Sequence, residues 1–212
     1  MVALRGQLSI KQYVKGKPQP WGIKMFALCG RSGMMYDFII YQGGSTEFDQ
    51  NILKKFGLGA TVVFHLSQRI PQYYYLYFDN YFTTHQVLEI LSQKDIYAAG
   101  TIRINRFKNS PLINDKEASK KTRGYSEEVV SQDKNVVLCK WVDNKSVVMA
   151  LNFIGVGSTD EVKRRNKNEK KYITVPRPEV VKLYNHSMGG VDKMDYLLTL
   201  YRIFVKSRKW TL

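Results

Sequence analysis

Two acidic positions far apart in the chain have residue types and surroundings suited to divalent-metal chemistry. Asp79 follows the aromatic run 73–78 (YYYLYF), which we expect to form a strand buried on both faces. A carboxylate at the end of such a strand needs a cation, a metal ion or backbone N–H groups, because its desolvation is costly. The second position is Asp192, in the segment 189–195 (GGVDKMD). Together the two positions suggest a metal site for phosphoryl chemistry.

The segment after residue 189 is expected to be helical, which places Asp192 and Asp195, three residues apart, on roughly one face. If this helix packs across the end of the 73–78 strand, Asp192 approaches Asp79, and a bound Mg²⁺ relieves their repulsion. Two such ions about 3.5–4 Å apart would activate an attacking oxygen and stabilise the leaving one. Structural interpretations stay open, because Asp79 can cap the following helix and the other two carboxylates can complement their own helix dipole.

Other kinds of catalytic site have little support in the sequence. The three histidines, His65, His85 and His186, lack the spacing of zinc ligands. Neither a phosphate-binding glycine loop nor a nucleophile elbow occurs. Cys29 and Cys139 lie in apolar, strand-like runs and are expected to be reduced core residues.

The charge balance favours a polyanionic partner. The chain has 212 residues, with 33 Lys and Arg against 18 Asp and Glu, a net charge of +15 and a pI near 9.7. Each phosphate that a cation neutralises releases counterions and adds affinity that does not depend on base sequence. No stretch has the roughly 18 apolar residues of a membrane span, and no basic amphipathic helix is evident. A nucleic acid is therefore the expected partner, without a membrane or a small-molecule substrate.

Two basic segments could contact that partner. The run 163–171 (KRRNKNEKK) is open to three interpretations: a nuclear-localisation signal, a phosphate-contacting loop or a solvated surface. The segment 206–210 (KSRKW) joins cations to an aromatic residue, which suits backbone contact or base stacking. Trp141 is expected in the core rather than at a base. The predicted DNA-contacting residues are Lys163, Arg164, Arg165, Lys167, Lys170, Lys171, Arg208 and Lys209.

The elements that must position these residues follow an α/β order in the first half of the chain. Apolar patterns and turn residues predict a two-stranded hairpin, a helix, a strand, a helix begun by a capping box at Thr83 and Gln86, and a further strand. These elements are expected over residues 21–29, 34–41, 61–70, 73–78, 83–91 and 96–103. The order predicts a mixed sheet with helices packed against it.

The composition changes after this first half. Residues 105–124 are polar and basic, so we expect a loop or the boundary of an insertion there. Two β-rich runs, 136–142 and 145–154, meet at a turn at residues 143–144 and predict a small β-unit inserted after the main sheet. Pro176 and Pro178 are expected to precede a short helix, and the final helix starts at 189–190. We therefore predict three parts, over residues 1–104, 105–175 and 176–212.

Four segments resemble the transposase domain of the piggyBac family, in the order in which that family has them: 17–24 (KPQPWGIK), 75–84 (YLYFDNYFTT), 100–103 (GTIR) and 184–195 (YNHSMGGVDKMD). The resemblance implies a ribonuclease-H-like core interrupted by an inserted β-rich domain. It also implies DNA strand cleavage and transfer with Mg²⁺ held by three aspartates. Asp79 matches the second of these aspartates and Asp192 the third, while Asp195 matches an accessory acidic residue.

The first aspartate of the family would fall just before Met1, ahead of the segment 1–6 (MVALRG), so the chain is expected to be truncated at both ends. Two functions follow as hypotheses. The chain is either an ancestrally active Mg²⁺-dependent transposase core, or a domesticated, catalytically silent DNA-binding protein that lacks the first aspartate. Whether it is an enzyme is left open. A nuclear location and a homodimer are further expectations.

Overall fold

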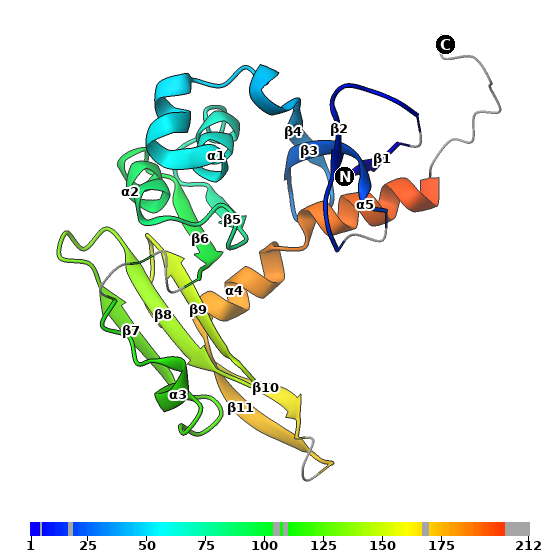
Figure 1. The fold of residues 1–212 in the computed structure, drawn as a ribbon. Helices are drawn as coiled ribbons and strands as arrows, with labels where there is room; N and C mark the ends of the chain where they lie inside the picture. The colour runs from blue at the N-terminus through cyan, green and yellow to red at the C-terminus, as the bar shows by residue number, and fades with distance from the viewer. Residues whose placement is uncertain (5, 17–18, 104–106, 108–109, 167–169, 202–212) are drawn as a thin grey trace.

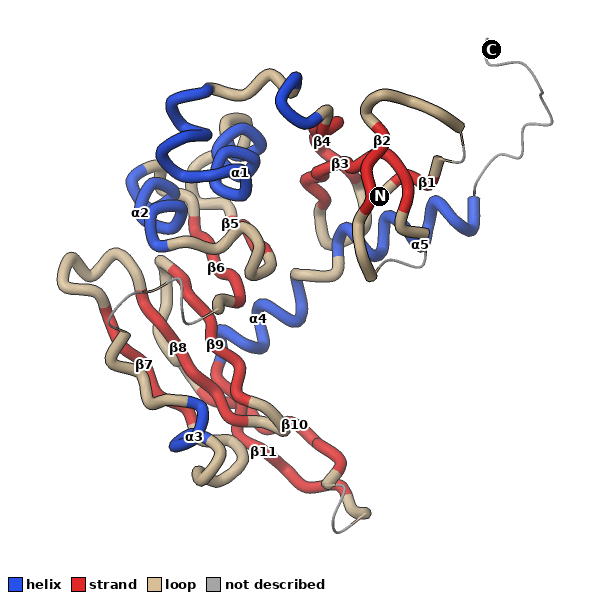
Figure 2. The backbone as a smooth tube through the Cα atoms, in the orientation of Figure 1, coloured by secondary structure: helices blue, strands red, loops and turns tan. Residues whose placement is uncertain are grey.

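The computed structural model describes residues 1–201 except 5, 17–18, 104–106, 108–109 and 167–169. The described chain forms three β-sheets with helices between them, and a long hairpin extends from one end (Figure 1). Figure 2 shows that two consecutive helices, α4 (Glu179–Ser187) and α5 (Gly190–Tyr201), run from the lower sheet to the N-terminal strands. No helix among these residues has the length and apolar character of a membrane span.

The predicted N-terminal hairpin is confirmed. Strands β3 (Trp21–Cys29) and β4 (Met35–Tyr41) pair antiparallel, from Lys24 opposite Tyr41 to Cys29 opposite Met35. Two short strands that the sequence did not predict, β1 (Val2–Ala3) and β2 (Lys11–Tyr13), also pair with β3. A short 3-10 helix, η1 (Gly43–Ser45), follows the hairpin.

The first long helix, α1 (Gln50–Ser67), begins eleven residues earlier than expected and ends before Pro71. Asp49 caps it, since its carboxylate accepts the N–H groups of Asn51 and Ile52. The helix is kinked at Gly57, whose φ is 79°. This kink divides the apolar pattern, and only the half beyond it is mainly buried, which is the half that the sequence predicted.

A five-stranded sheet lies beneath α1 and α2 (His85–Gln93), in the order β5-β6-β9-β8-β7. Its strands are β5 (Tyr75–Phe78), β6 (Tyr97–Thr101), β7 (Ser126–Val130), β8 (Val137–Val142) and β9 (Ser146–Leu151). β5 and β6 are parallel, as α/β crossovers require, and the other pairs are antiparallel.

Three features of this part of the chain differ from expectation. β5 is an edge strand whose Tyr75 side chain is 56% exposed, so the aromatic run is not buried on both faces. The β8–β9 hairpin forms at the predicted turn, but β9 pairs directly with β6 instead of starting a separate unit. The short helix α3 (Asp115–Ala118) lies in the segment that we expected to be a loop. The boundaries of the three predicted parts, 1–104, 105–175 and 176–212, remain a prediction.

The first three residues of the basic run, 163–165, belong to a strand of a hairpin arm. Strands β10 (Thr159–Arg165) and β11 (Tyr172–Pro178) pair antiparallel, so Pro176 and Pro178 belong to a strand instead of only preceding a helix. Trp141 lies in the core as predicted, 3% exposed, and its Nε1 donates a hydrogen bond to the Pro176 carbonyl oxygen at 2.9 Å. This contact fixes the arm to the end of the five-stranded sheet.

The main core lies between the five-stranded sheet and helices α1 and α2. A second cluster joins the other face of the sheet to α4 and the arm, and a third joins β3 and β4 to α1. The buried residues of the main core include Ala60, Val63, Phe64, Phe78, Val87, Leu88, Leu91, Ala98, Leu138 and Ala150. Cys139 is buried and Cys29 half-buried, and both are free thiols.

An ion pair between a buried lysine and an exposed aspartate holds α3 against this sheet. Lys140 is 2% exposed, and its Nζ donates to Asp115 Oδ1 at 2.8 Å and to the Ile113 carbonyl oxygen at 2.6 Å. The hydrogen bond from Lys140 is the main reason that the pKa of Asp115 is lowered, and Ser146 adds to it.

We expect Asp115→Ala to lower the free energy of unfolding by about 2–3 kcal/mol, because the buried ammonium group would lose its counterion. Urea denaturation measures this change. Glu117→Ala, at an exposed position of the same helix, is the matched control. Equal midpoints for the two variants would contradict a structural role for the pair.

Candidate functional site

A cavity of about 980 Å³ lies where β5, the β3–β4 hairpin, the end of α1 and the junction of α4 and α5 meet. Asp79 and Asp192 both line it. The structure therefore places at one cavity the two carboxylates that the sequence predicted as metal ligands, although more than a hundred residues of chain separate them. Asp195 is not among the residues that line this cavity.

Asp79 occupies a tight turn directly after β5. Its Oδ1 accepts a hydrogen bond from the Tyr81 N–H at 2.8 Å, and its carbonyl oxygen accepts one from Thr83 Oγ1 at 2.8 Å. The side chain is exposed, because β5 is an edge strand, so the expected buried carboxylate was wrong. These bonds hold the turn while the carboxylate remains accessible to solvent.

Asp79 does not cap the helix that follows. Thr84 is the N-cap residue of α2, and its Oγ1 accepts the Val87 N–H at 3.3 Å. The capping box that we predicted at Thr83 is therefore one residue too early, and Thr83 is fully buried against the Asp79 turn. The helix-capping interpretation of Asp79 is excluded by this geometry.

Asp192 is placed by the packing of α5 on β3. Gly190 lies so close to the hairpin turn that an added Cβ would stand 2.7 Å from the Gly30 carbonyl oxygen. Four residues on, the buried Met194 contacts Cys29, with Sδ and Sγ 3.5 Å apart. These contacts fix the first turn of α5, where Asp192 is exposed at the cavity.

Asp195 lies near Cys29. The pKa of the Cys29 thiol is raised by burial first and by the negative charge of Asp195 second. Met194 of α5 is buried, whereas Leu198 is 58% exposed. The accessory role of Asp195 stays a prediction.

Tyr184 of α4 lies near Asp79. The pKa of its hydroxyl is raised by burial, and the negative charge of Asp79 adds to the effect, against a lowering hydrogen bond with Thr101. Because an anionic phenolate is disfavoured beside the carboxylate, Tyr184 presents a neutral hydroxyl group near Asp79 at neutral pH.

The donor set fits part of a magnesium site. Carboxylate oxygens suit Mg²⁺, which is commonly held by one or two protein carboxylates together with water and substrate phosphate oxygens. Asp79 and Asp192 supply two such ligands at one cavity. Within the described part of the chain, no group of three His, Cys, Asp or Glu residues could hold a metal ion by itself.

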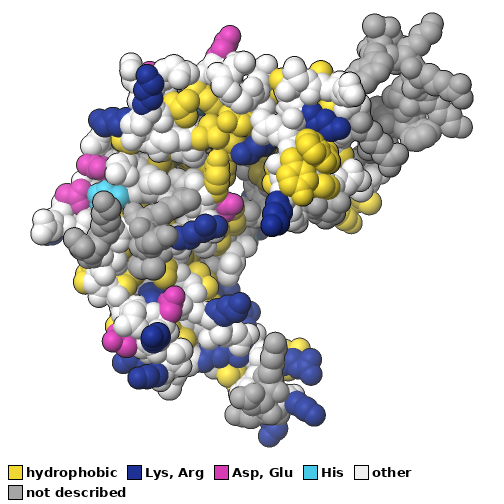
Figure 3. Space-filling view, viewed as in Figure 1, with side chains coloured by type: hydrophobic (Ala, Val, Ile, Leu, Met, Phe, Trp, Pro, Cys, Tyr) yellow, Lys and Arg dark blue, Asp and Glu magenta, His cyan; other side chains and the backbone are white. Residues whose placement is uncertain are grey.

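A second feature is the cationic side of the β10–β11 arm, where the space-filling view shows Lys and Arg side chains gathered beside a deep concavity (Figure 3). Alternation along β10 makes Lys163 and Arg165 exposed and Arg164 half-buried. Lys170 and Lys171 are also exposed. Of the predicted DNA-contacting residues, Lys167, Arg208 and Lys209 lie outside the described residues.

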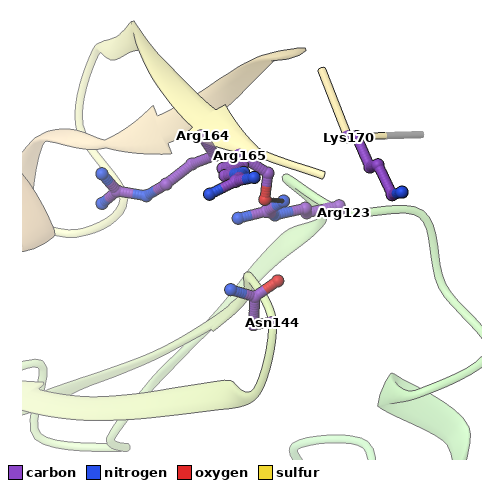
Figure 4. Close-up of a pocket in the computed structure, with 5 residues that line it drawn as sticks. All are labelled: Arg123, Asn144, Arg164, Arg165 and Lys170. Atoms are coloured by element: carbon purple, nitrogen blue, oxygen red, sulfur yellow. Dashed lines mark hydrogen bonds between the residues drawn. The ribbon is translucent and has the colours of Figure 1, made fainter. Parts of the chain in front are cut away.

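Sequence reasoning missed residues that complete this cationic side. Arg123 and Asn144 line a smaller cavity with Arg164, Arg165 and Lys170 (Figure 4). The sequence around residue 144 predicted only a turn, and no pattern near Arg123 predicted a contact with residues 163–171. Arg123 and Arg165 are 42 residues apart in the sequence, so local sequence patterns cannot predict their contact.

An ion-pair group holds the base of the arm. Arg177 donates from Nε and Nη2 to the two carboxylate oxygens of Asp160, at 2.9 and 2.7 Å. Lys182 Nζ of α4 lies 3.4 Å from Asp160 Oδ2. The hydrogen bond from Arg177 is the largest cause that lowers the pKa of Asp160 to about 2.

This pair predicts a pH-dependent stability. Because the pKa of Asp160 falls from 3.8 to about 2 on folding, its stabilisation is present above about pH 4 and disappears toward pH 2. Asp160→Asn should lower the free energy of unfolding by about 1 kcal/mol at pH 7, since the pair is partly exposed. Thermal melts from pH 7 to pH 2 measure the difference, with Glu161→Gln as control. A difference that persists at pH 2 would contradict the assignment.

Comparisons with known proteins agree on one family. A family model described as Transposase IS4 matches residues 1–212. The human PiggyBac transposable element-derived protein 3 is 33% identical over 216 residues, which cover 99% of this chain and 35% of that protein. The human PiggyBac transposable element-derived protein 2 is 28% identical over 209 residues, which cover 97% of this chain and 35% of that protein. The chain thus spans about a third of the length of these curated relatives.

A solved structure has a similar fold. The cryo-EM structure of the piggyBac transposase synaptic complex with hairpin DNA matches 97% of this chain and 40% of that one, with a TM-score of 0.67 and 22% identity. The mixed α/β arrangement of sheets and helices is therefore shared with a piggyBac transposase.

Proposed function

This chain belongs to the piggyBac-type transposase family that the Transposase IS4 model describes, and from this premise we propose that it binds duplex DNA as part of a transposase-derived protein. The observation that carries the proposal is the cationic side of the β10–β11 arm, on a chain of net charge +15. The similar solved structure is a complex with hairpin DNA, which supports the choice of partner. A nuclear location and the pairing of two copies belong to the same proposal.

The proposed architecture is a ribonuclease-H-like core formed by residues 1–104 and 176–212, with residues 105–175 as an inserted β-rich domain. The α/β order of β3, β4, α1, β5, α2 and β6 supports the core. The run of antiparallel strands from β7 to β10 supports the insertion, although β9 continues the sheet of the core.

Duplex binding should weaken steeply with salt. With about four phosphates neutralised, we expect the affinity for a 30-base-pair duplex to fall about 100-fold between 50 and 200 mM salt, because released counterions drive binding. Fluorescence anisotropy over a salt series measures the slope.

The double variant Lys163→Gln/Arg165→Gln should lower both the affinity and the slope, since both side chains are exposed on the arm. Lys94→Gln/Lys116→Gln removes the same charge from the residue just after α2 and from α3, and serves as the control. Binding that is absent, or insensitive to salt, would refute the proposed function.

A second candidate function is Mg²⁺-dependent DNA strand cleavage, favoured by the position of Asp79 and Asp192 at one cavity. When bound, Mg²⁺ would supply charge neutralisation at the reacting phosphate. Asp79 and Asp192 would hold it, and Tyr184 would keep a neutral hydroxyl group beside Asp79. The alternative is a catalytically silent DNA-binding protein, and cleavage assays distinguish the two.

A further inference from the structure

A cavity of about 450 Å³ lies between the β8–β9 turn, the segment before β7 and the end of the arm. Its walls carry four cationic side chains and one amide: Arg123, Arg164, Arg165, Lys170 and Asn144. Figure 4 shows the guanidinium group of Arg123 between the end of β10 and the turn that carries Asn144. The segment before β7 and the arm thus contribute cations to one small space, and the β8–β9 turn contributes an amide.

A single carboxylate organises two of these arginines. Asp143 Oδ1 accepts a hydrogen bond from Arg123 Nε at 2.5 Å, and its Oδ2 accepts one from Arg164 Nε at 3.1 Å. Asp143 and Arg123 are only 17% and 16% exposed, so solvent screens this pair weakly. Because the carboxylate takes the Nε atom of each arginine, it orients both guanidinium groups and leaves their terminal nitrogens for other acceptors.

The terminal nitrogens of Arg123 are incompletely satisfied. Its Nη1 donates to the Arg165 carbonyl oxygen at 3.2 Å. Its Nη2 is buried and has no hydrogen-bond partner among the described residues. An unsatisfied buried donor costs about 1–3 kcal/mol, more for a charged group. An anion in the adjoining cavity would supply the acceptor after a small movement of the side chain.

The charge of the site also favours an anionic ligand. Four cations surround the cavity, and Asp143 is the carboxylate that the structure pairs with two of them. Arg123 and Arg164 are partly buried, Arg165 and Lys170 are exposed, and gathering their like charges is unfavourable unless an anion joins them. Guanidinium forks match the several oxygens of a phosphate, and an ammonium group adds a point charge.

We propose that this cavity, which we call the Asp143 clamp (Arg123, Asp143, Asn144, Arg164, Arg165 and Lys170), binds a phosphate group of the nucleic-acid backbone. The proposal rests on the proposed DNA binding and goes further, because it names a preorganised pocket. A contact of this kind fixes the register of a protein on its duplex without reading base sequence. The arm would thereby be anchored at its junction with the β8–β9 turn.

The test uses a substitution for which general electrostatics and the loss of the Asp143 clamp predict opposite changes in the affinity for a duplex. Asp143→Asn raises the net charge by one, so general attraction would tighten binding of a duplex. The Asp143 clamp predicts weaker binding, by about threefold, because the two guanidinium groups lose their orientation. Arg123→Gln should weaken binding about tenfold and reduce the salt slope by about one. Arg123→Lys keeps the charge but loses the fork, and it should also weaken binding.

Lys94→Gln, an equal loss of charge on an exposed position just after α2, is the matched control and should change affinity less than about twofold. Circular dichroism and melting curves establish that each variant is folded. If Asp143→Asn binds DNA more tightly, or Arg123→Lys binds as the original chain does, the Asp143 clamp is refuted while general DNA binding stands.

A melting experiment with inorganic phosphate tests the Asp143 clamp independently of DNA binding, which is the proposed function. Phosphate should raise the melting temperature of the original chain more than chloride of equal ionic strength, and Arg123→Gln should lose this difference. If the chain binds no DNA, the proposed function fails, and with it the nucleic-acid source of the phosphate. Binding of polyglutamate as tight as that of DNA would overturn the choice of phosphate as the ligand.

Discussion

Replacing Asp79 or Asp192 with Asn is expected to abolish Mg²⁺-dependent DNA strand cleavage, with a loss of at least about 10³-fold in rate. Both carboxylates line one cavity, and each would supply a charged oxygen that an amide cannot replace. The assay follows nicking of a labelled duplex by the protein at its natural full length, with Mg²⁺ or Mn²⁺.

Asp37→Asn is the control for this experiment. Asp37 lines the same cavity but pairs with Arg69 Nη1 at 3.5 Å, so it is held as a structural residue. Its substitution should leave cleavage within about twofold of the original, as surface ion pairs contribute little. If Asp37→Asn is as damaging as Asp79→Asn, the assignment of the cavity carboxylates is wrong.

DNA binding by the same variants decides between the two functions. Neither Asp79→Asn nor Asp192→Asn should weaken duplex binding, because each removes a negative charge from a surface that faces a polyanion. A protein that binds DNA in a salt-sensitive way but never cleaves it would support the catalytically silent alternative. Cleavage that survives both substitutions would place the chemistry elsewhere in the molecule.

The positions of Asp79 and Asp192 could be anticipated because each follows a strong local signal. An aromatic run ending in Asp79 predicts a strand end, and two glycines before Asp192 predict a helix start. Both elements occur in the structure, as β5 and α5. The two carboxylates line one cavity, but α5 reaches it by packing on β3, whereas we had expected it to pack across the end of the 73–78 strand.

The environment of Asp79 could not be predicted in the same way. A continuous run of tyrosines has no alternation, so periodicity cannot tell an edge strand from a central one. The structure places β5 at the sheet edge, with Tyr73, Tyr74 and Tyr75 exposed. The prediction of a buried carboxylate failed because it depended on long-range pairing, not on local pattern.

The sequence did not predict the β10–β11 arm, for a different reason. In β10 the inward positions are Asp160, Val162 and Arg164, so only one of the three is apolar and the alternation is hidden. β11 contains Pro176, which is tolerated because β11 lies at the edge of a two-stranded ribbon. Charged residues fill inward positions here because ion pairs, such as Asp160 with Arg177, satisfy them.

Gly100→Ala is expected to lower the free energy of unfolding by about 3 kcal/mol or more, because the position has no room for a methyl group. Gly100 of β6 is opposite Phe78 of β5, and an added Cβ would stand 2.7 Å from the Phe78 carbonyl oxygen and clash still more severely with Thr83 Oγ1. Urea denaturation measures the change. Gly44→Ala is the control, since no atom lies within 4 Å of an added Cβ there.

The same substitution should also disturb the candidate site. Thr83 Oγ1 donates the hydrogen bond that holds the Asp79 carbonyl oxygen, so pushing Thr83 away releases the turn that carries the carboxylate. At low temperature, where Gly100→Ala remains folded, its cleavage rate should therefore fall while its salt-dependent DNA binding persists, because the arm lies elsewhere. Loss of both activities in a folded variant would indicate that the arm depends on this strand pair. Equal stability of Gly100→Ala and Gly44→Ala would show that the close approach of β5 and β6 does not fix Asp79.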